Sequence, residues 1–159
     1  LPEELEQNRE LNGMFYQKKR RSRRSIMKES LKKWPTRQPI YFELDQSILN
    51  DYELLWKVEN VLSYFSSNTC LNFKEGRKLQ PVIYFMQGNG CYSFIGRQYQ
   101  WRIQPISVGS PCDKHFGVMA HEIAHTLGLF HEQARFDRDQ FVTINTNNIE
   151  NSTLQQYDK

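Results

Sequence analysis

The sequence lacks any apolar run long enough to cross a membrane. Its longest wholly apolar segment, residues 82–86, is about five residues long, whereas a spanning helix needs roughly 20. The first residues, Leu-Pro-Glu-Glu-Leu-Glu, have neither the basic nor the apolar region of a signal peptide. Because the chain begins with Leu1 and ends in a polar stretch at Lys159, we expect it to be an excerpt, with any signal peptide upstream.

The sequence lacks an excess of positive charge outside one segment. Ten of the 21 basic residues, but only one acid (Glu29), fall within residues 18–37. The remainder carries 11 bases and 17 acids, and this acidic balance argues against a nucleic-acid-binding body. The total of 159 residues suits one domain or part of a larger one.

Cysteine is scarce and odd in number. Cys70, Cys91 and Cys112 form no C-x-x-C pair, which argues against a cysteine zinc knuckle or a thioredoxin-type redox motif. The spacings fit an oxidising compartment with one disulfide and one unpaired thiol, without deciding which two cysteines pair.

Residues 1–24 are polar and end in a run, residues 18–24, in which six of seven positions are basic. Such a run stays extended and solvated because it cannot bury apolar area. It fits three interpretations: a nuclear-localisation or heparin-binding patch, a merely solvated segment, or a proprotein-convertase cleavage site of the R-x-R-R type ending at Arg24.

From Trp34 onward the pattern is that of a folded α+β domain. Apolar positions spaced by three and four predict amphipathic helices, and β-branched or aromatic runs predict strands. Pro105 indicates an edge strand, because proline cannot donate to a ladder. The predicted strands are residues 39–44, 71–73, 82–86 and 103–108, and the predicted helices are residues 48–66 and 114–130.

The second predicted helix contains the sequence His121-Glu122-Ile123-Ala124-His125. Histidines at i and i+4 lie one turn apart on the same face, so both rings can reach one metal ion. Gly128 can break the helix and return His131 as a third nitrogen ligand. Three neutral imidazoles leave Zn²⁺ an open position for water, and Glu122 is placed to act on that water without being a ligand.

Chance is a weak explanation for this pattern. At this composition the H-E-x-x-H-x-x-G-x-x-H spacing is expected about 10⁻⁵ times per chain. The alternative is a helix whose histidines are hydrogen-bonded surface or core residues. His115 is interpreted as an ordinary helix-start residue and is not assigned to the metal.

These residues resemble a known family. H-E-x-x-H-x-x-G-x-x-H is the metzincin zinc motif, and its extension, His131-Glu132-x-x-Arg135-x-Asp137-Arg138-Asp139, is similar to that of the astacin metalloendopeptidases. Similarity runs from about residue 25 to the end and includes Trp34, the segment 69–73 and the segment 90–93. The resemblance implies a zincin-like N-terminal subdomain, with a twisted mixed sheet, a backing helix and an active-site helix.

The resemblance also implies a mature N-terminus at Ser25, released by a convertase-type protease that cuts after Arg24. The new N-terminal ammonium would pair with Glu132. The alternative interpretation is that Glu132 is an exposed carboxylate at the end of a helix. These implications favour the cleavage-site interpretation of the basic run. Residues 1–24 would then be a propeptide remnant and residues 25–159 part of the peptidase domain.

For the cysteines, the resemblance implies a disulfide between Cys91 and Cys112 and a partner for Cys70 beyond Lys159. The resemblance further implies that the protein is secreted. Asn151-Ser152-Thr153 is a glycosylation sequon, which is consistent with secretion. The family's second half-domain, with a methionine turn and a tyrosine near zinc, is expected to be missing. The family's F-x-G-D latency element has no counterpart in the leader, so no latency mechanism is assigned.

The sequence therefore predicts a secreted metalloendopeptidase holding one Zn²⁺ per chain, with ligands His121, His125 and His131 and Glu122 as general base. The strand at residues 103–108 would bind the peptide substrate, and neither nucleic acid nor a membrane span is expected. One alternative is a catalytically incompetent zinc-binding fragment with half a cleft. The other alternative is a basic module that binds nucleic acid or heparin. Against it, the basic run at residues 18–24 contains no aromatic residue on which a base could stack.

Overall fold

The structure is a computed structural model that describes residues 30–158. Arg24, Ser25 and the basic run lie outside these residues. In chain order the elements are η1 (Ser30–Lys32), β1 (Ile40–Leu44), α2 (Gln46–Leu49), α3 (Tyr52–Asn68), β2 (Phe73–Glu75), β3 (Val82–Met86), β4 (Cys91–Tyr92), β5 (Ile103–Val108), η2 (Cys112–Lys114), α4 (Phe116–Thr126), η3 (Glu132–Ala134), η4 (Arg138–Gln140), η5 (Thr146–Asn148) and η6 (Asn151–Tyr157), where η is a 3-10 helix.

Five strands form one mixed sheet in the order β2-β1-β3-β5-β4. The β1–β2, β1–β3 and β3–β5 pairs are parallel, and only β4 runs antiparallel to its neighbour, β5. The expected α+β fold with a mixed sheet is therefore confirmed. Among the described residues, no helix combines the length and the apolar character that crossing a bilayer requires.

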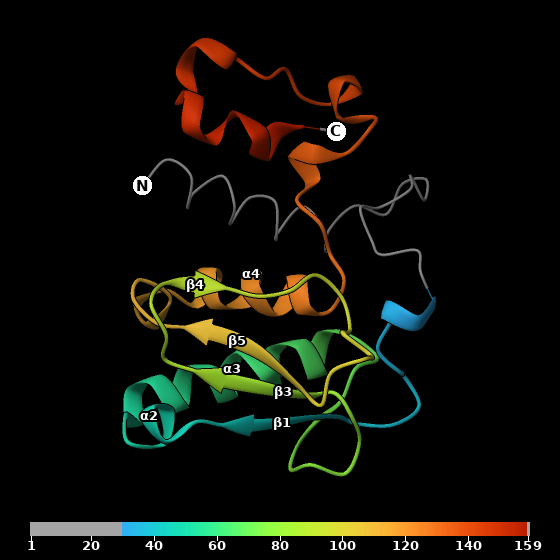
Figure 1. The fold of residues 1–159 in the computed structure, drawn as a ribbon, viewed down its shortest axis with the longest axis vertical. Coiled ribbons are helices and arrows are strands. Elements are labelled where there is room, and N and C mark those ends of the chain that lie inside the picture. Colours follow the sequence, from blue (N-terminus) through green and yellow to red (C-terminus); the bar gives the residue numbers. More distant parts are fainter. Residues whose placement is uncertain (1–29, 159) are drawn as a thin grey trace.

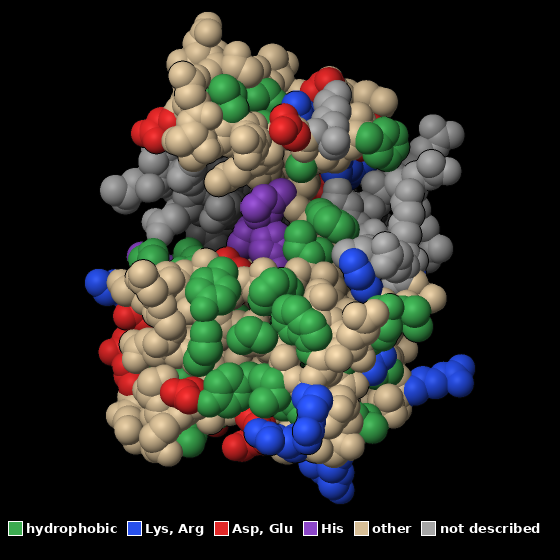
Figure 2. Space-filling model, viewed as in Figure 1, with side chains coloured by type: hydrophobic (Ala, Val, Ile, Leu, Met, Phe, Trp, Pro, Cys, Tyr) green, Lys and Arg blue, Asp and Glu red, His purple; other side chains and the backbone are tan. Residues whose placement is uncertain are grey.

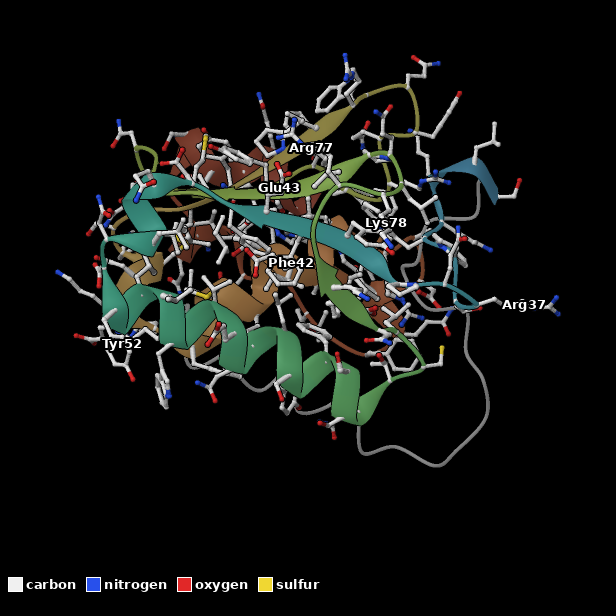
Figure 3. All side chains as sticks on the ribbon, turned by 90° about the horizontal axis from the view of Figure 1, so that it is seen from below. Arg37, Phe42, Glu43, Tyr52, Arg77 and Lys78 are labelled. Atoms are coloured by element: carbon white, nitrogen blue, oxygen red, sulfur yellow. A yellow bond between two sulfur atoms is a disulfide. The ribbon has the colours of Figure 1, made fainter. Side chains whose placement is uncertain are left out.

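Both long helices, α3 and α4, cover the same face of the sheet (Figure 1). Side chains alternate along a strand, and Ile83 and Phe85 of β3 join the buried core together with Ile106 of β5. Phe42 lies between β1 and α3 (Figure 3), with its ring centroid 6.1 Å from that of Phe85. This core fixes α4, the helix with the two closely spaced histidines, against a rigid sheet.

The helix predicted at residues 48–66 is two helices, α2 and α3. Asp45 caps α2 by accepting from the Ser47 backbone N–H at 2.9 Å, and Asp51 caps α3 by accepting from the Leu54 N–H at 3.0 Å. Each aspartate satisfies a backbone donor that has no partner in the first helical turn, so each starts its own helix.

The prediction that β5 is an edge strand is wrong, because β5 lies between β3 and β4. On this side of the sheet the edge strand is β4, which lies in a stretch where the sequence predicted no strand. β4 pairs only with Ser107 and Val108. The part of β5 that contains Pro105 therefore has a strand on one side only, where a residue without an N–H is tolerated.

Helix α4 ends at Thr126, four residues before the predicted end. Gly128 has φ +104°, a left-handed conformation that glycine adopts without steric cost. Its N–H donates to the His125 carbonyl at 2.8 Å, and the Leu129 N–H donates to the Ala124 carbonyl at 3.0 Å. This pair of bonds is a Schellman motif, and it turns the chain sharply after α4.

Candidate metal centre

The three histidines of the motif lie together at the end of α4. The ring centroids of His121 and His125 are 4.3 Å apart, as expected for neighbours one turn apart on a helix. The Schellman turn at Gly128 brings His131 back over them, with ring centroids 5.1 Å from His121 and 4.6 Å from His125. Figure 2 shows histidine side chains gathered between the part of the molecule that holds the sheet and the segment beyond His131.

The Nε2 atoms of the three rings converge. The Nε2 of His131 lies 3.1 Å from that of His121 and 2.8 Å from that of His125. Four-coordinate zinc, with Zn–N bonds of about 2.0–2.1 Å, holds its nitrogen ligands about 3.3 Å apart. The observed separations are close to this value, so the three residues could bind one metal ion.

The hydrogen bonding of His125 decides which of its nitrogens faces the others. Its Nδ1 lies 2.7 Å from the Leu129 carbonyl oxygen, which can only accept, so Nδ1 carries the hydrogen. The Nε2 of the neutral ring then presents a lone pair to the cluster, the form that ligates metals. The Schellman turn therefore positions His131 and also orients His125.

Burial favours the uncharged form of two of the three rings, those of His121 and His131. Burial, and secondarily the nearby His125 and His131, lowers the pKa of His121 to about 4. Burial and then His125 lower the pKa of His131 as well. Both rings are therefore neutral near pH 7, and bare nitrogen lone pairs pointing at one another are repulsive unless a cation lies between them.

Glu122 is buried beside the cluster, with 8 % of its surface exposed. Burial raises the pKa of its carboxyl above the usual value, and a hydrogen bond from Ser93 opposes this shift. Ser93 Oγ lies 2.9 Å from Glu122 Oε2 and 2.7 Å from the Glu122 carbonyl oxygen. A buried carboxylate next to three imidazoles is a suitable proton acceptor for chemistry at the cluster.

Three charged side chains that follow His131 bond to one another: Glu132, Arg135 and Asp137. Arg135 donates to Glu132 Oε2 at 2.8 Å and makes two parallel bonds to Asp137, both 2.8 Å long. These bonds, led by the one to Asp137, raise the pKa of the Arg135 guanidinium. Arg135 and Asp137 had no role predicted from the sequence beyond their motif positions. The expected partner of Glu132, the amino group of Ser25, lies outside the described residues.

The structure joins Cys91 and Cys112 in a disulfide with a Cα–Cα distance of 5.7 Å. The bond ties the edge strand β4 to η2, the short element immediately before α4, and so fixes the start of the histidine-bearing helix. Cys70 is an exposed free cysteine within the chain. Asn151, the first residue of the sequon, is exposed at the start of η6.

The sequence model of the astacin peptidase family matches residues 26–159. The chain belongs to the astacin family. The resemblance inferred from the histidine motif is thereby confirmed over most of the chain.

Curated astacin relatives include zinc metalloproteinase nas-27 of Caenorhabditis elegans, 39% identical over 131 residues that make up 82% of this chain. Zinc metalloproteinase dpy-31 of Brugia malayi is 32% identical over 156 residues, or 97% of this chain. The chain spans only 30% of the first relative and 26% of the second. Both relatives are named as zinc metalloproteinases.

Among solved structures, the fold is similar to that of high choriolytic enzyme 1, a hatching enzyme zinc-protease of the medaka Oryzias latipes. The TM-score is 0.68 at 27% sequence identity, over 90% of this chain and 68% of the medaka chain. The mixed sheet with its two helices is therefore the astacin architecture.

Proposed function

We propose that this chain is the N-terminal portion of the catalytic domain of a secreted zinc metalloendopeptidase. The observation that carries the proposal is the convergence of three Nε2 atoms beside a buried carboxylate, that of Glu122. Membership of the astacin family and the relatives named zinc metalloproteinases support this chemistry. Residues 1–24 would be a propeptide remnant and residues 25–159 part of the peptidase domain.

His121, His125 and His131 would hold one zinc ion per chain through their Nε2 atoms. When bound, zinc would lower the pKa of a water towards about 7 and polarise the scissile carbonyl. Glu122 would take the proton of the attacking water and then deliver it to the departing amine. Its burial supports this role, because a raised carboxyl pKa makes the residue a better base for water.

The peptide substrate would lie along the sheet edge. That edge is β4 rather than β5, so an added strand would pair beside Cys91 and Tyr92, next to Ser93 and Glu122. Main-chain hydrogen bonds to an edge strand give affinity with little sequence preference. The disulfide between Cys91 and Cys112 would keep this edge in place while substrate binds.

A proprotein-convertase-type protease would cut after Arg24 and release the ammonium of Ser25 to pair with Glu132. A carboxylate accepts several hydrogen bonds, so Glu132 can keep its bond from Arg135 and receive the new terminus. Cys70 would pair with a cysteine beyond Lys159. The exposure of Asn151 supports its use as a glycosylation site in a secreted protein.

Chelation tests the proposal. The full-length protein is expected to hydrolyse casein, to lose this activity after treatment with 1,10-phenanthroline, and to regain it when zinc is added back to the dialysed protein. A magnesium add-back is the control, because imidazole ligands favour zinc over magnesium. Activity that survives complete removal of zinc would overturn the assignment.

A second candidate is that the 159-residue chain alone binds zinc without cleaving peptides. The chain covers only 68% of the medaka hatching enzyme, and a cleft with part of its wall missing would not hold a substrate in a reactive orientation. Zinc binding and casein hydrolysis are measured for the 159-residue chain and for the full-length protein. We expect both to bind zinc and only the longer protein to cleave casein.

A further inference from the structure

Ser93 makes two contacts to a single residue of the metal helix. Its Oγ lies 2.7 Å from the backbone carbonyl oxygen of Glu122 and 2.9 Å from Oε2 of the same residue's carboxylate. The hydroxyl has one hydrogen to donate, and it shares this hydrogen between the backbone carbonyl and the side-chain carboxylate of Glu122. This contact closes a ring and adds to the restriction that burial already places on the rotation of the glutamate side chain.

The segment that carries Ser93 is itself held on both sides. It follows β4 directly, and Cys91 ties β4 to η2 through the disulfide. On the other side, the Gly96 N–H donates to the His125 carbonyl at 2.8 Å. The side chain of Gln104, which is fully buried, donates to the Gly96 carbonyl at 2.9 Å and accepts from the Gln98 N–H at 2.9 Å. Ser93 is therefore a fixed support and can hold a partner in one orientation.

We propose that Ser93 is a positioning residue for Glu122. It holds Oε2 and so leaves the other carboxylate oxygen, Oε1, for the proton of the attacking water. This inference rests on the proposed function, in which Glu122 is the general base. The contact that orients His125 comes from the Leu129 carbonyl and not from Ser93, so the effect of Ser93 is on the orientation of the base and not on metal binding.

The test compares Ser93→Ala with wild type in the full-length protein. We expect kcat to fall by about 10–100-fold, the usual cost of losing a side chain that orients a site residue, while KM changes little. Zinc affinity, measured by competition with a chromophoric chelator, should be unchanged. A wild-type kcat, or a fall in kcat that merely follows loss of zinc, would contradict the positioning role.

Ser107→Ala is a matched control. Ser107 lies in the same β4–β5 region, and its Oγ donates to the Gly90 carbonyl at 2.6 Å. This hydroxyl therefore bonds to the backbone of the edge and not to Glu122. Its loss should lower thermal stability at least as much as the loss of Ser93 does, because Ser107 is fully buried, with kcat close to wild type. An equal fall in kcat for both variants would mean that the edge as a whole, and not the bond to Glu122, determines the rate.

A second pair of variants, Ser93→Thr and Ser93→Val, avoids the cavity that alanine would leave. Thr and Val have nearly the same shape, but only Thr keeps a hydroxyl. Ser93→Thr is expected to retain most of the kcat and Ser93→Val to lose it, whereas equal rates would overturn the inference.

Glu122→Gln separates this inference from the proposed function. If that variant is inactive while Ser93→Val is as fast as Ser93→Thr, only the role of Ser93 fails, and if Glu122→Gln stays active, the proposed base itself is wrong.

Discussion

Glu122→Gln is expected to lower the kcat for peptide cleavage in the full-length protein by about 10²–10⁴-fold, the range typical of a lost general base. Glutamine has nearly the shape of glutamate and can still accept a hydrogen bond from Ser93, but an amide does not take a proton from water near pH 7. The zinc content should stay at the wild-type level, because the three imidazoles are unchanged. Steady-state kinetics and metal analysis on the same sample give both results.

Glu53→Gln is the control for this experiment, since it makes the same chemical change on the exposed surface of α3. Glu53 pairs with Lys57 at 2.6 Å and its side chain is 77% exposed, so its loss should leave kcat unaltered. If Glu122→Gln were as fast as Glu53→Gln with the same zinc content, Glu122 would not be the base.

His131→Ala is expected to weaken zinc binding by more than about 100-fold. Removing a residue that only orients a ligand already costs 10–100-fold in affinity or activity, and this variant removes a ligand nitrogen outright. Peptide cleavage should fall with the zinc content. The affinity is measured by chelator competition at fixed pH, because protons compete with the metal for imidazole.

His115→Ala is the matched control for His131→Ala, because His115 stands at the N-cap of α4 and outside the histidine cluster. It should bind zinc like the wild type. Equal zinc affinities for the two variants would exclude His131 as a ligand.

The strands at residues 82–86 and 103–108 have the bounds that the sequence predicted, because both are largely apolar runs buried in the sheet. The helix at residues 48–66 was predicted as one element because Leu54, Val58 and Leu62 keep a helical period. Asp51 interrupts it, and Asp45 starts α2 before residue 48, both through capping hydrogen bonds that periodicity does not reveal. Strand β4 has two residues, too few for any period to appear.

The grouping of the three histidines could be predicted because helix geometry fixes the spacing of His121 and His125, and a glycine marks the turn to His131. The contacts that orient the group could not be predicted. The Leu129 carbonyl that binds His125 is a backbone atom and has no sequence signature. Ser93 stands 29 positions from Glu122 in the chain, and only the fold brings them together.

X-ray absorption at the zinc edge, with metal content measured on the same full-length sample, tests the three-histidine site most directly. The proposed function predicts about one zinc per chain, bound by three imidazole nitrogens at about 2.0–2.1 Å, with the imidazole scattering reduced in His131→Ala. Substoichiometric metal in correctly folded protein, or a zinc shell made of sulfur ligands, would contradict the account.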